Sequence, residues 1–305
     1  MSFGFIFQKS SIYILVIESV FIIVLFSTIG GITYNGEFHS NMNVLLSWSG
    51  DLFNLGPAIY AVVNAHPDQH ISFYITTVNA DLLPKYKTHF AERPILNTKF
   101  YFETCQTRYL TKRIWIVGDD TYIRIVFPNA HPEMERFLQL DGDAIVVQDI
   151  KDMYFHDFNN QSAIVVFDFA RRFEGFKNYF NAGVMVFNNF KYINDNILNK
   201  SIEYLKWLNG HMGRWYNDQR VLNKMFIDSR IVFPQKYNEF DFRKFGNNTK
   251  IFHFYRAKCK PYNQKCNRTQ APYKLWDCFY KTYKEKPLLW RDTRNITICT
   301  NEMFN

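Results

Sequence analysis

The segment that most constrains this chain is Asp141-Gly142-Asp143, an acidic triplet between two apolar runs. Residues 137–140 are typical of a buried strand that enters the triplet, and residues 144–147 of a second strand that leaves it. In extended backbone, side chains two residues apart point to the same face, so we expect both carboxylates on one side. Two carboxylates on one side can bind Mg²⁺ or Mn²⁺, and such an ion can hold a diphosphate. Asp-x-Asp also occurs by chance, so this interpretation depends on the other motifs.

Strand and helix patterns alternate along most of the chain. Strands are predicted at residues 43–47, 71–75, 113–117, 137–140, 163–167, 183–187 and 251–254. Helices are predicted at residues 54–66, 81–90 and 197–208, and from about residue 121. Asp119 and Asp120 are the expected cap of the helix near residue 121, and Gly210 the expected stop of the last helix. This alternation predicts an α/β fold, with a mostly parallel central sheet flanked by helices. Ligands bind at the carboxyl ends of such strands, where the triplet lies.

Composition limits the possible ligands. The chain has 305 residues, 47% of them hydrophobic, which is enough for a sizeable core. Its net charge of +8 suits an anionic ligand such as a nucleotide sugar, an anionic membrane surface or nucleic acid. No Lys/Arg-rich block or zinc-finger spacing occurs, so we expect no nucleic-acid partner.

The N-terminal region contains a long apolar run. Residues 12–32 are apolar apart from short interruptions, chiefly Glu18-Ser19, and about 20 such residues span a bilayer as a helix. Lys9 precedes the run and Glu37 follows it, which favours a cytosolic N-terminus. A cleaved signal peptide is the alternative, but the run is long and no Ala-x-Ala-like site follows it. We therefore expect a single-pass type II anchor.

These patterns divide the chain into five parts. We expect a cytosolic tail at residues 1–10, a transmembrane signal-anchor at 11–33, a short stem at 34–41, a catalytic domain at 42–262, and a cysteine-containing extension at 263–305. The catalytic domain would then lie in the lumen of the Golgi or the endoplasmic reticulum.

Two further features agree with a luminal location. Asn-x-Ser/Thr sequons of a glycoprotein begin at Asn160, Asn199, Asn247, Asn267 and Asn295. Four cysteines lie near the C-terminus, at positions 259, 266, 278 and 299, while Cys105 lies alone. In an oxidising lumen the four can form two disulfides with three possible connectivities, and the alternative is that they are free and buried.

Several ordered motifs resemble glycosyltransferase family 8, the glycogenin-like retaining enzymes. The resemblance runs from about residue 44 to residue 262, and its motifs are residues 122–125, 140–143, 180–184, 217–223 and 253–254. It implies the GT-A fold, a Rossmann-like nucleotide-sugar-binding domain. It also implies a UDP-sugar donor bound through Mn²⁺, with Mg²⁺ as the alternative ion.

The resemblance assigns the metal ligands and the residues near the diphosphate. Asp141, Asp143 and His253 are the implied ligands, a set that suits Mn²⁺. Arg124 is implied to contact the donor, and Lys260 the diphosphate. The alternatives are a histidine that closes a strand for His253 and a solvated helix charge for Arg124.

Other residues are implied to bind the sugar or the base. Asn181, Ala182 and Gly183 would bind the sugar together with Asp168, and the small Ala-Gly pair would let the backbone approach it. Asp218 and Gln219 are the implied catalytic residues beside the anomeric carbon, and Phe53 would stack on uracil. The alternatives are a turn for Asn181, an unpartnered loop carboxylate for Asp168, a helix cap for Asp218 and core packing for Phe53.

Two positions depart from the family pattern. Gly142 stands where relatives often have alanine, and it is counted with the donor-binding residues. The family's closing pattern, His-Phe-x-Gly, two residues and Lys-Pro-Trp, has Arg256 in place of glycine and one added residue before Lys260. Lys260 best matches the phosphate-binding lysine, and Lys258 or Arg256 is the alternative.

The motifs together predict a metal-dependent retaining transferase that moves a hexose or pentose from a UDP-sugar to a luminal glycan, glycoprotein or other acceptor. The alternatives are an inverting GT-A transferase, which needs a carboxylate base, and a catalytically silent membrane-tethered protein that binds sugar or nucleotide.

Overall fold

A computed structural model describes residues 41–95, 97–105, 107, 119–169, 178–211, 217–255, 260–263, 266 and 268–285. The predicted anchor at residues 11–33, the strand at 113–117 and the residues 256–259 of the closing loop lie outside these ranges. The part of the chain from Asn41 onward forms one compact unit, to which the following description applies. Within the described residues, no helix is both long enough and apolar enough to cross a membrane.

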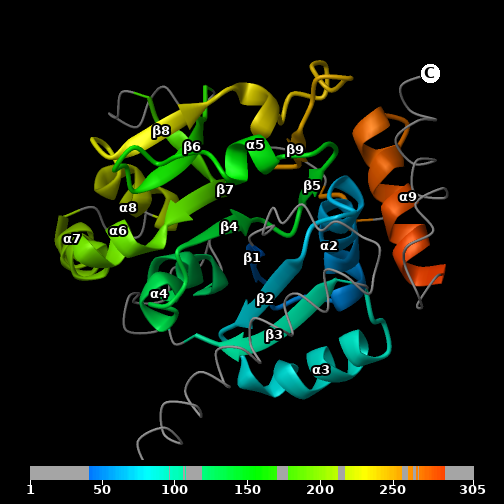
Figure 1. Cartoon of the computed structure of the whole chain (residues 1–305), viewed down its shortest axis with the longest axis horizontal. Coiled ribbons are helices and arrows are strands. Elements are labelled where there is room, and N and C mark those ends of the chain that lie inside the picture. Colours follow the sequence, from blue (N-terminus) through cyan, green and yellow to red (C-terminus); the bar gives the residue numbers. More distant parts are fainter. Residues whose placement is uncertain are drawn as a thin grey trace, which may run out of the picture. The chain divides into compact units, whose positions relative to one another are not determined.

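The central sheet has seven strands and is mostly parallel, as the sequence predicts (Figure 1). Its order is β3 (Thr98–Thr104), β2 (Ile71–Thr77), β1 (Met42–Ser47), β4 (Arg136–Leu140), β7 (Phe180–Asn188), β6 (Ala163–Phe167) and β8 (Arg230–Phe233). Only β7 runs antiparallel to both of its neighbours. A separate antiparallel pair joins β5 (Ala144–Val146) to β9 (Ile251–His253).

Helices cover both faces of this sheet. The α-helices are α2 (Leu52–Ala65), α3 (Leu83–Ala91), α4 (Ile123–Ala130), α5 (Lys151–Tyr154), α6 (Asn189–Asn194), α7 (Ile197–His211), α8 (Asp218–Met225) and α9 (Ala271–Glu285). Three 3-10 turns accompany them, η1 (Ala80–Leu82), η2 (Asp119–Tyr122) and η3 (Gln235–Tyr237).

The two-residue period of the strands creates two hydrophobic cores. In β1, Val44 and Leu46 pack in one core with α2, α3 and α9, whereas Leu45 packs in the other with α4, α6, α7 and α8. Because β1, β4 and β6 carry apolar residues on both faces, these strands are largely buried, as is usual for parallel sheets.

Two predicted helix boundaries are wrong. Asp119 and Asp120 belong to η2 instead of capping α4, and the Asp120 carboxylate accepts a hydrogen bond from the backbone N–H of Val78 at 3.0 Å. Gly210 does not stop its helix, because α7 continues to His211. In both places a tertiary contact or a continuing helix overrides the local residue preference.

The cysteine-containing extension forms a helix that packs on the catalytic domain. α9 lies against α2 (Figure 1), and its buried Trp276, Phe279 and Tyr283 join the core on that side of the sheet. Cys278 of this helix and Cys266 before it are both disulfide-bonded. Cys105 is a free thiol.

The packing of α9 on α2 depends on the absence of a side chain at Gly56. A Cβ at this position would lie 2.2 Å from the ring atom Cδ1 of Tyr283, which is closer than packed atoms approach. We expect Gly56→Ala to lower the free energy of unfolding by about 1–2 kcal/mol, since overpacking outweighs the helix preference of alanine.

Urea unfolding of the purified protein would measure this change. Gly210→Ala in α7 is the matched control, because a Cβ there meets nothing within 4 Å. It should be neutral or stabilising by up to about 1 kcal/mol. Equal unfolding midpoints for the two variants would contradict the close packing at Gly56.

Candidate functional site

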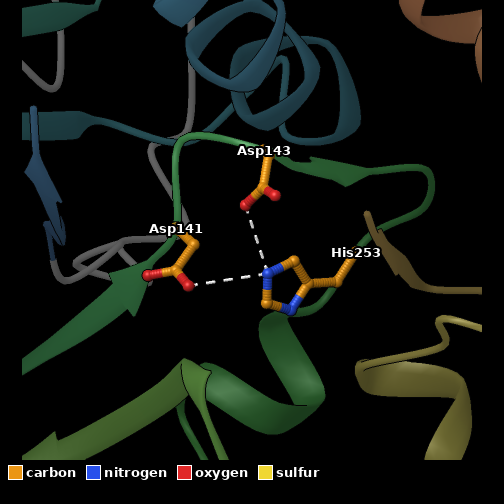
Figure 2. A group of neighbouring side chains, drawn as sticks. All are labelled: Asp141, Asp143 and His253. Atoms are coloured by element: carbon orange, nitrogen blue, oxygen red, sulfur yellow. Dashed lines mark ion pairs between the residues drawn. The ribbon is translucent and has the colours of Figure 1, made fainter. Parts of the chain in front are cut away.

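The acidic triplet forms a tight turn at the carboxyl end of β4. The backbone N–H of Ala144 donates to the carbonyl oxygen of Asp141 at 3.0 Å, so the backbone is not extended as the sequence analysis assumed. The two carboxylates nevertheless face one side, because the turn carries Asp143 back toward Asp141 (Figure 2). The expected pairing of the two aspartates is therefore correct, although the backbone geometry inferred for it is wrong.

His253 completes a cluster of three potential metal ligands. Its Nε2 lies 3.5 Å from Oδ2 of Asp141 and 3.2 Å from Oδ1 of Asp143, and Figure 2 shows both carboxylates turned to this nitrogen. The three ligand atoms lie within 4.8 Å of one another. β9 places the histidine here, because Ala144 of β5 pairs directly with His253.

The electrostatics of this cluster favour a bound cation. Burial acts to lower the pKa of His253, but the carboxylates of Asp143 and Asp141 outweigh it and raise the pKa to about 9. Burial acts to raise the pKa of each carboxyl, but Arg124 and His253 hold the pKa of Asp141 below its usual range. These carboxylates stabilise a positive charge on the buried imidazole. They would also attract a divalent ion that replaces the proton.

The surroundings of the cluster fit a metal ion. Two carboxylates and one imidazole are ligands that Mn²⁺ accepts. The second ring nitrogen of His253 lies 3.1 Å from Oδ1 of Asn238, the outer hydrogen bond that metal-ligating histidines usually make. A Cβ at Gly183 would lie 2.2 Å from Cε1 of His253 and 2.5 Å from Oδ2 of Asp141. The cluster therefore needs glycine at this position of β7.

Arg124 is buried and bridges two carboxylates. Its Nη2 lies 2.7 Å from Oδ1 of Asp141, and its Nε lies 3.3 Å from Oδ2 of Asp218. It also donates to the carbonyl oxygen of Ala182. These contacts exclude a solvated helix charge and place a fixed positive charge beside the acidic turn.

Lys260 supplies a second positive charge from the opposite side. Its Nζ lies 2.5 Å from Oδ2 of Asp143 and donates to the carbonyl oxygen of Phe254 at 3.0 Å. The structure thus brings the lysine that was matched to the phosphate-binding position into the acidic cluster. The alternatives, Lys258 and Arg256, lie outside the described residues.

Asn181 and Gln219 form a buried amide pair next to the cluster. Nδ2 of Asn181 donates to Oε1 of Gln219 at 3.2 Å, and the backbone N–H of Ala182 donates to the same oxygen at 3.1 Å. Asn181 lies within β7, so it is not a turn residue. Nε2 of Gln219 is buried and has no hydrogen-bond partner in the part of the chain that the structure describes.

Asp218 faces Arg124 rather than capping its own helix. Asn217 is the N-cap of α8, and its side chain accepts from the backbone N–H of Arg220 at 3.0 Å. Asp218 is buried, and this burial raises its pKa although Arg124 acts in the opposite direction. The structure therefore gathers six of the predicted residues, Arg124, Asp141, Asp143, Asp218, His253 and Lys260, into one charged cluster.

Gly142 packs against Trp48, a residue that the sequence analysis did not select. A Cβ at Gly142 would lie 2.6 Å from Cε3 of the indole, and a Cβ at Gly50 would lie 2.9 Å from Cζ2 of the same ring. Trp48 lies directly after β1, and its ring is 6.1 Å from that of Tyr262 in an edge-on arrangement. Trp48 therefore forms one wall of the acidic turn.

Phe53 packs among other aromatic side chains, and Asp168 directly follows β6. The ring of Phe53 packs against His89 of α3 at 5.0 Å and under the guanidinium of Arg93 at 4.9 Å, so its core-packing alternative is favoured. Stacking of Phe53 on a base stays a prediction. Asp168 is buried at the end of β6, where its backbone N–H donates to the carbonyl oxygen of Tyr179 at 2.7 Å.

Two buried asparagines that sequence reasoning did not assign a role hold the site in place. Asn223 of α8 accepts from the backbone N–H of Phe180 at 2.8 Å and donates to its carbonyl oxygen at 2.9 Å. Asn238, after η3, contacts both His253 and Asn181. Asn223 belongs to one of the motifs, which could have selected it, whereas no pattern in the sequence points to Asn238.

Comparison with known proteins establishes the family. The model of glycosyl transferase family 8 matches residues 31–266, and the chain belongs to this family. The chain is 27% identical over 203 residues to a lipopolysaccharide 1,2-glucosyltransferase of Escherichia coli, a match that covers 59% of this chain and 57% of that protein. It is 26% identical over 205 residues to the glycosyltransferase GlyF of Streptococcus pneumoniae, covering 64% of this chain and 48% of GlyF. The matches thus span only about half the length of these relatives.

Solved structures share the fold. The galactosyltransferase LgtC, crystallised with donor and acceptor sugar analogs, superposes with a TM-score of 0.68 at 18% identity, covering 84% of this chain and all (100%) of LgtC. The glycosyltransferase GlyE of Streptococcus pneumoniae gives a TM-score of 0.59 at 18% identity, covering 86% of this chain and 63% of GlyE. The predicted GT-A-like α/β fold is confirmed.

The close approach of β7 to the acidic turn gives a test of the metal site. Gly183→Ala should weaken Mn²⁺ binding at least tenfold, because the new methyl group must displace His253 or Asp141 from the cluster. Titration of Mn²⁺ followed by electron paramagnetic resonance of the free ion measures the affinity.

Gly246→Ala serves as the control, since a Cβ there meets nothing within 4 Å, and its affinity should equal that of the wild type. Unchanged Mn²⁺ affinity in a folded Gly183→Ala variant would show that the ion does not bind between these residues.

Proposed function

We propose that the protein is a metal-dependent retaining glycosyltransferase that moves a hexose or pentose from a UDP-sugar to an acceptor in the lumen of a secretory organelle. The observation that supports it most is the convergence of Asp141 and Asp143, from the turn after β4, with His253 of β9. Membership of glycosyl transferase family 8 supports the reaction class.

Asp141, Asp143 and His253 would hold Mn²⁺, with Mg²⁺ as the alternative. The ion would supply Lewis-acid stabilisation of the negative charge that develops on the leaving diphosphate. Lys260, whose Nζ lies 2.5 Å from Oδ2 of Asp143, would add a second positive charge for the diphosphate.

The residues of β7 and α8 would orient the sugar. The buried amide group of Gln219 has an Nε2–H without a partner among the described residues, and this group could donate to a sugar oxygen. Arg124 fixes Asp218 and Asp141 relative to each other, so Asp218 would position the donor or the acceptor hydroxyl. No residue is assigned as a covalent nucleophile, so we propose front-face displacement, in which the leaving diphosphate takes the acceptor proton.

The location of the reaction is part of the proposal. The disulfide-bonded states of Cys266 and Cys278 suit an oxidising lumen, as do the sequons. The apolar run at residues 12–32 supports a single-pass type II anchor in the Golgi or endoplasmic reticulum membrane. The acceptor would then be a luminal glycan or glycoprotein.

A panel of UDP-sugars tests this proposal directly. The purified full chain is incubated with each donor and Mn²⁺, and release of UDP is measured with and without candidate acceptor glycans. One donor should give turnover that stops with EDTA and returns with Mn²⁺. Nuclear magnetic resonance of the product should show that the anomeric configuration of the donor is kept.

Removal of one ligand charge should abolish that turnover. Asp143→Asn is expected to lower kcat at least a hundredfold while the protein remains folded, because an amide is a poor ligand for Mn²⁺. Asp157→Asn, in an exposed turn, is the matched control and should keep full activity. Folded protein without turnover on any donor would favour a silent binding protein, and an inverted product would favour an inverting transferase.

A further inference from the structure

We propose that Asn238 is a positioning residue that fixes the metal-binding nitrogen of His253 and the amide of Asn181 in one arrangement. It rests on the proposed function, because it concerns the metal and sugar ends of that site. Asn238 is fully buried at the end of η3, and its side chain lies between the two residues. It therefore links the metal cluster to the amide pair of Asn181 and Gln219.

Two backbone N–H groups determine the orientation of the amides. The backbone N–H of Ala182 donates to Gln219 at 3.1 Å, and the backbone N–H of Gly183 donates to Asn181 at 3.0 Å. A backbone N–H can only donate, so the side-chain atom that it meets must be the carbonyl oxygen of each amide. The orientations of Asn181 and Gln219 follow from the main chain of β7.

The orientation of Asn181 determines that of Asn238, and Asn238 in turn determines which nitrogen of His253 carries the proton. Because Oδ1 of Asn181 is an acceptor, the group of Asn238 that lies 3.0 Å away must be its Nδ2, which donates. The oxygen of Asn238 is therefore left to face Nδ1 of His253 at 3.1 Å, and this nitrogen must carry a proton. When the imidazole is neutral, its lone pair is consequently on Nε2, the atom that faces Asp141 and Asp143.

The backbone around Asn238 holds this side chain in place. Its own N–H donates to the carbonyl oxygen of Gln235 at 2.9 Å, and its carbonyl oxygen accepts from Nε2 of Gln235 at 2.6 Å. The backbone N–H of Glu239 donates to the carbonyl oxygen of Ile251 at 2.9 Å. The carbonyl oxygen of Glu239 accepts from the backbone N–H of His253 at 2.8 Å, so the segment after Asn238 is bonded along β9. Asn238 thus moves with the strand that carries the histidine.

Burial makes any change in this hydrogen-bond arrangement energetically costly. Asn181 and His253 are each 1% exposed and Asn238 is 0% exposed, so no bulk water can replace a lost partner. A flipped Asn238 amide would set two acceptors against each other at Asn181 and two donors against each other at His253, and both faults are costly in a buried network. The metal-binding nitrogen and the sugar-facing amides are therefore coupled.

Two substitutions separate the two contacts. Asn238→Ala removes both, so Mn²⁺ affinity should fall about 10–100-fold, the usual effect of losing the outer partner of a metal-ligating histidine. Asn238→Asp keeps an acceptor for Nδ1–H of His253 but loses the donor to Asn181. It should bind Mn²⁺ as tightly as the wild type or more tightly, while kcat for UDP-sugar turnover falls roughly tenfold.

Asn189→Ala is the matched structural control. Asn189 is also 0% exposed, and its Nδ2 donates to the carbonyl oxygens of Pro128 and His131, outside the described contacts of the cluster. This variant should lose stability with unchanged Mn²⁺ affinity. Affinities are measured on the full chain by electron paramagnetic resonance of free Mn²⁺, and stability by urea unfolding.

The outcomes distinguish the two proposals. Wild-type protein that binds no Mn²⁺ overturns the proposed function together with this inference. Wild-type binding with unchanged affinity in a folded Asn238→Ala overturns the inference alone. If Asn238→Ala does not fold, the result for Asn238→Asp tests the inference. Retained Mn²⁺ affinity with reduced kcat supports the role of Asn238, and a tenfold or greater loss of affinity overturns it.

Discussion

The antiparallel pairing of β5 with β9 is the contact on which the site depends. β5 leaves the acidic turn directly, and its first residue, Ala144, pairs with His253 at the end of β9. The backbone N–H of Phe254 also donates to the carbonyl oxygen of Asp143 at 3.0 Å. These main-chain bonds bring His253 next to two aspartates that are more than 100 residues earlier in the sequence. No side-chain contact is needed for this pairing.

Opposite charges allow three carboxylates to lie close together at this largely buried site. Asp141, Asp143 and Asp218 are compensated by Arg124 and Lys260, and by His253 when it is protonated. Burial of this kind without partners would be prohibitive. Lys260 reaches this cluster from a loop and contacts one carboxylate, that of Asp143. Arg124, by contrast, is held by groups on α8, β7 and the turn, and by the carbonyl oxygen of Thr121 in η2.

The sequence was sufficient to predict the α/β fold and the six charged residues that converge. The inner strands β1, β4 and β6 carry apolar residues on both faces, and the acidic and histidine motifs follow in the family's order, so both signals are strong. Local preference was insufficient where tertiary contacts decide. Asp120 bonds to Val78 instead of capping a helix, and Asp141-Gly142-Asp143 turns instead of extending. Asn238 could not have been selected, because a single asparagine after a 3-10 turn has no pattern and acquires its role only from its neighbours in space.

The indole of Trp48 between Gly50 and Gly142 has a consequence for how this site can vary. Relatives often have alanine at the centre of the acidic triplet, yet here one added methyl group would meet the indole at 2.6 Å. A change at either position alone is therefore constrained by the other, so the two residues are expected to vary as a pair along any evolutionary path. A library that samples Gly142 and Trp48 jointly would reach functional sequences that one-at-a-time mutagenesis misses.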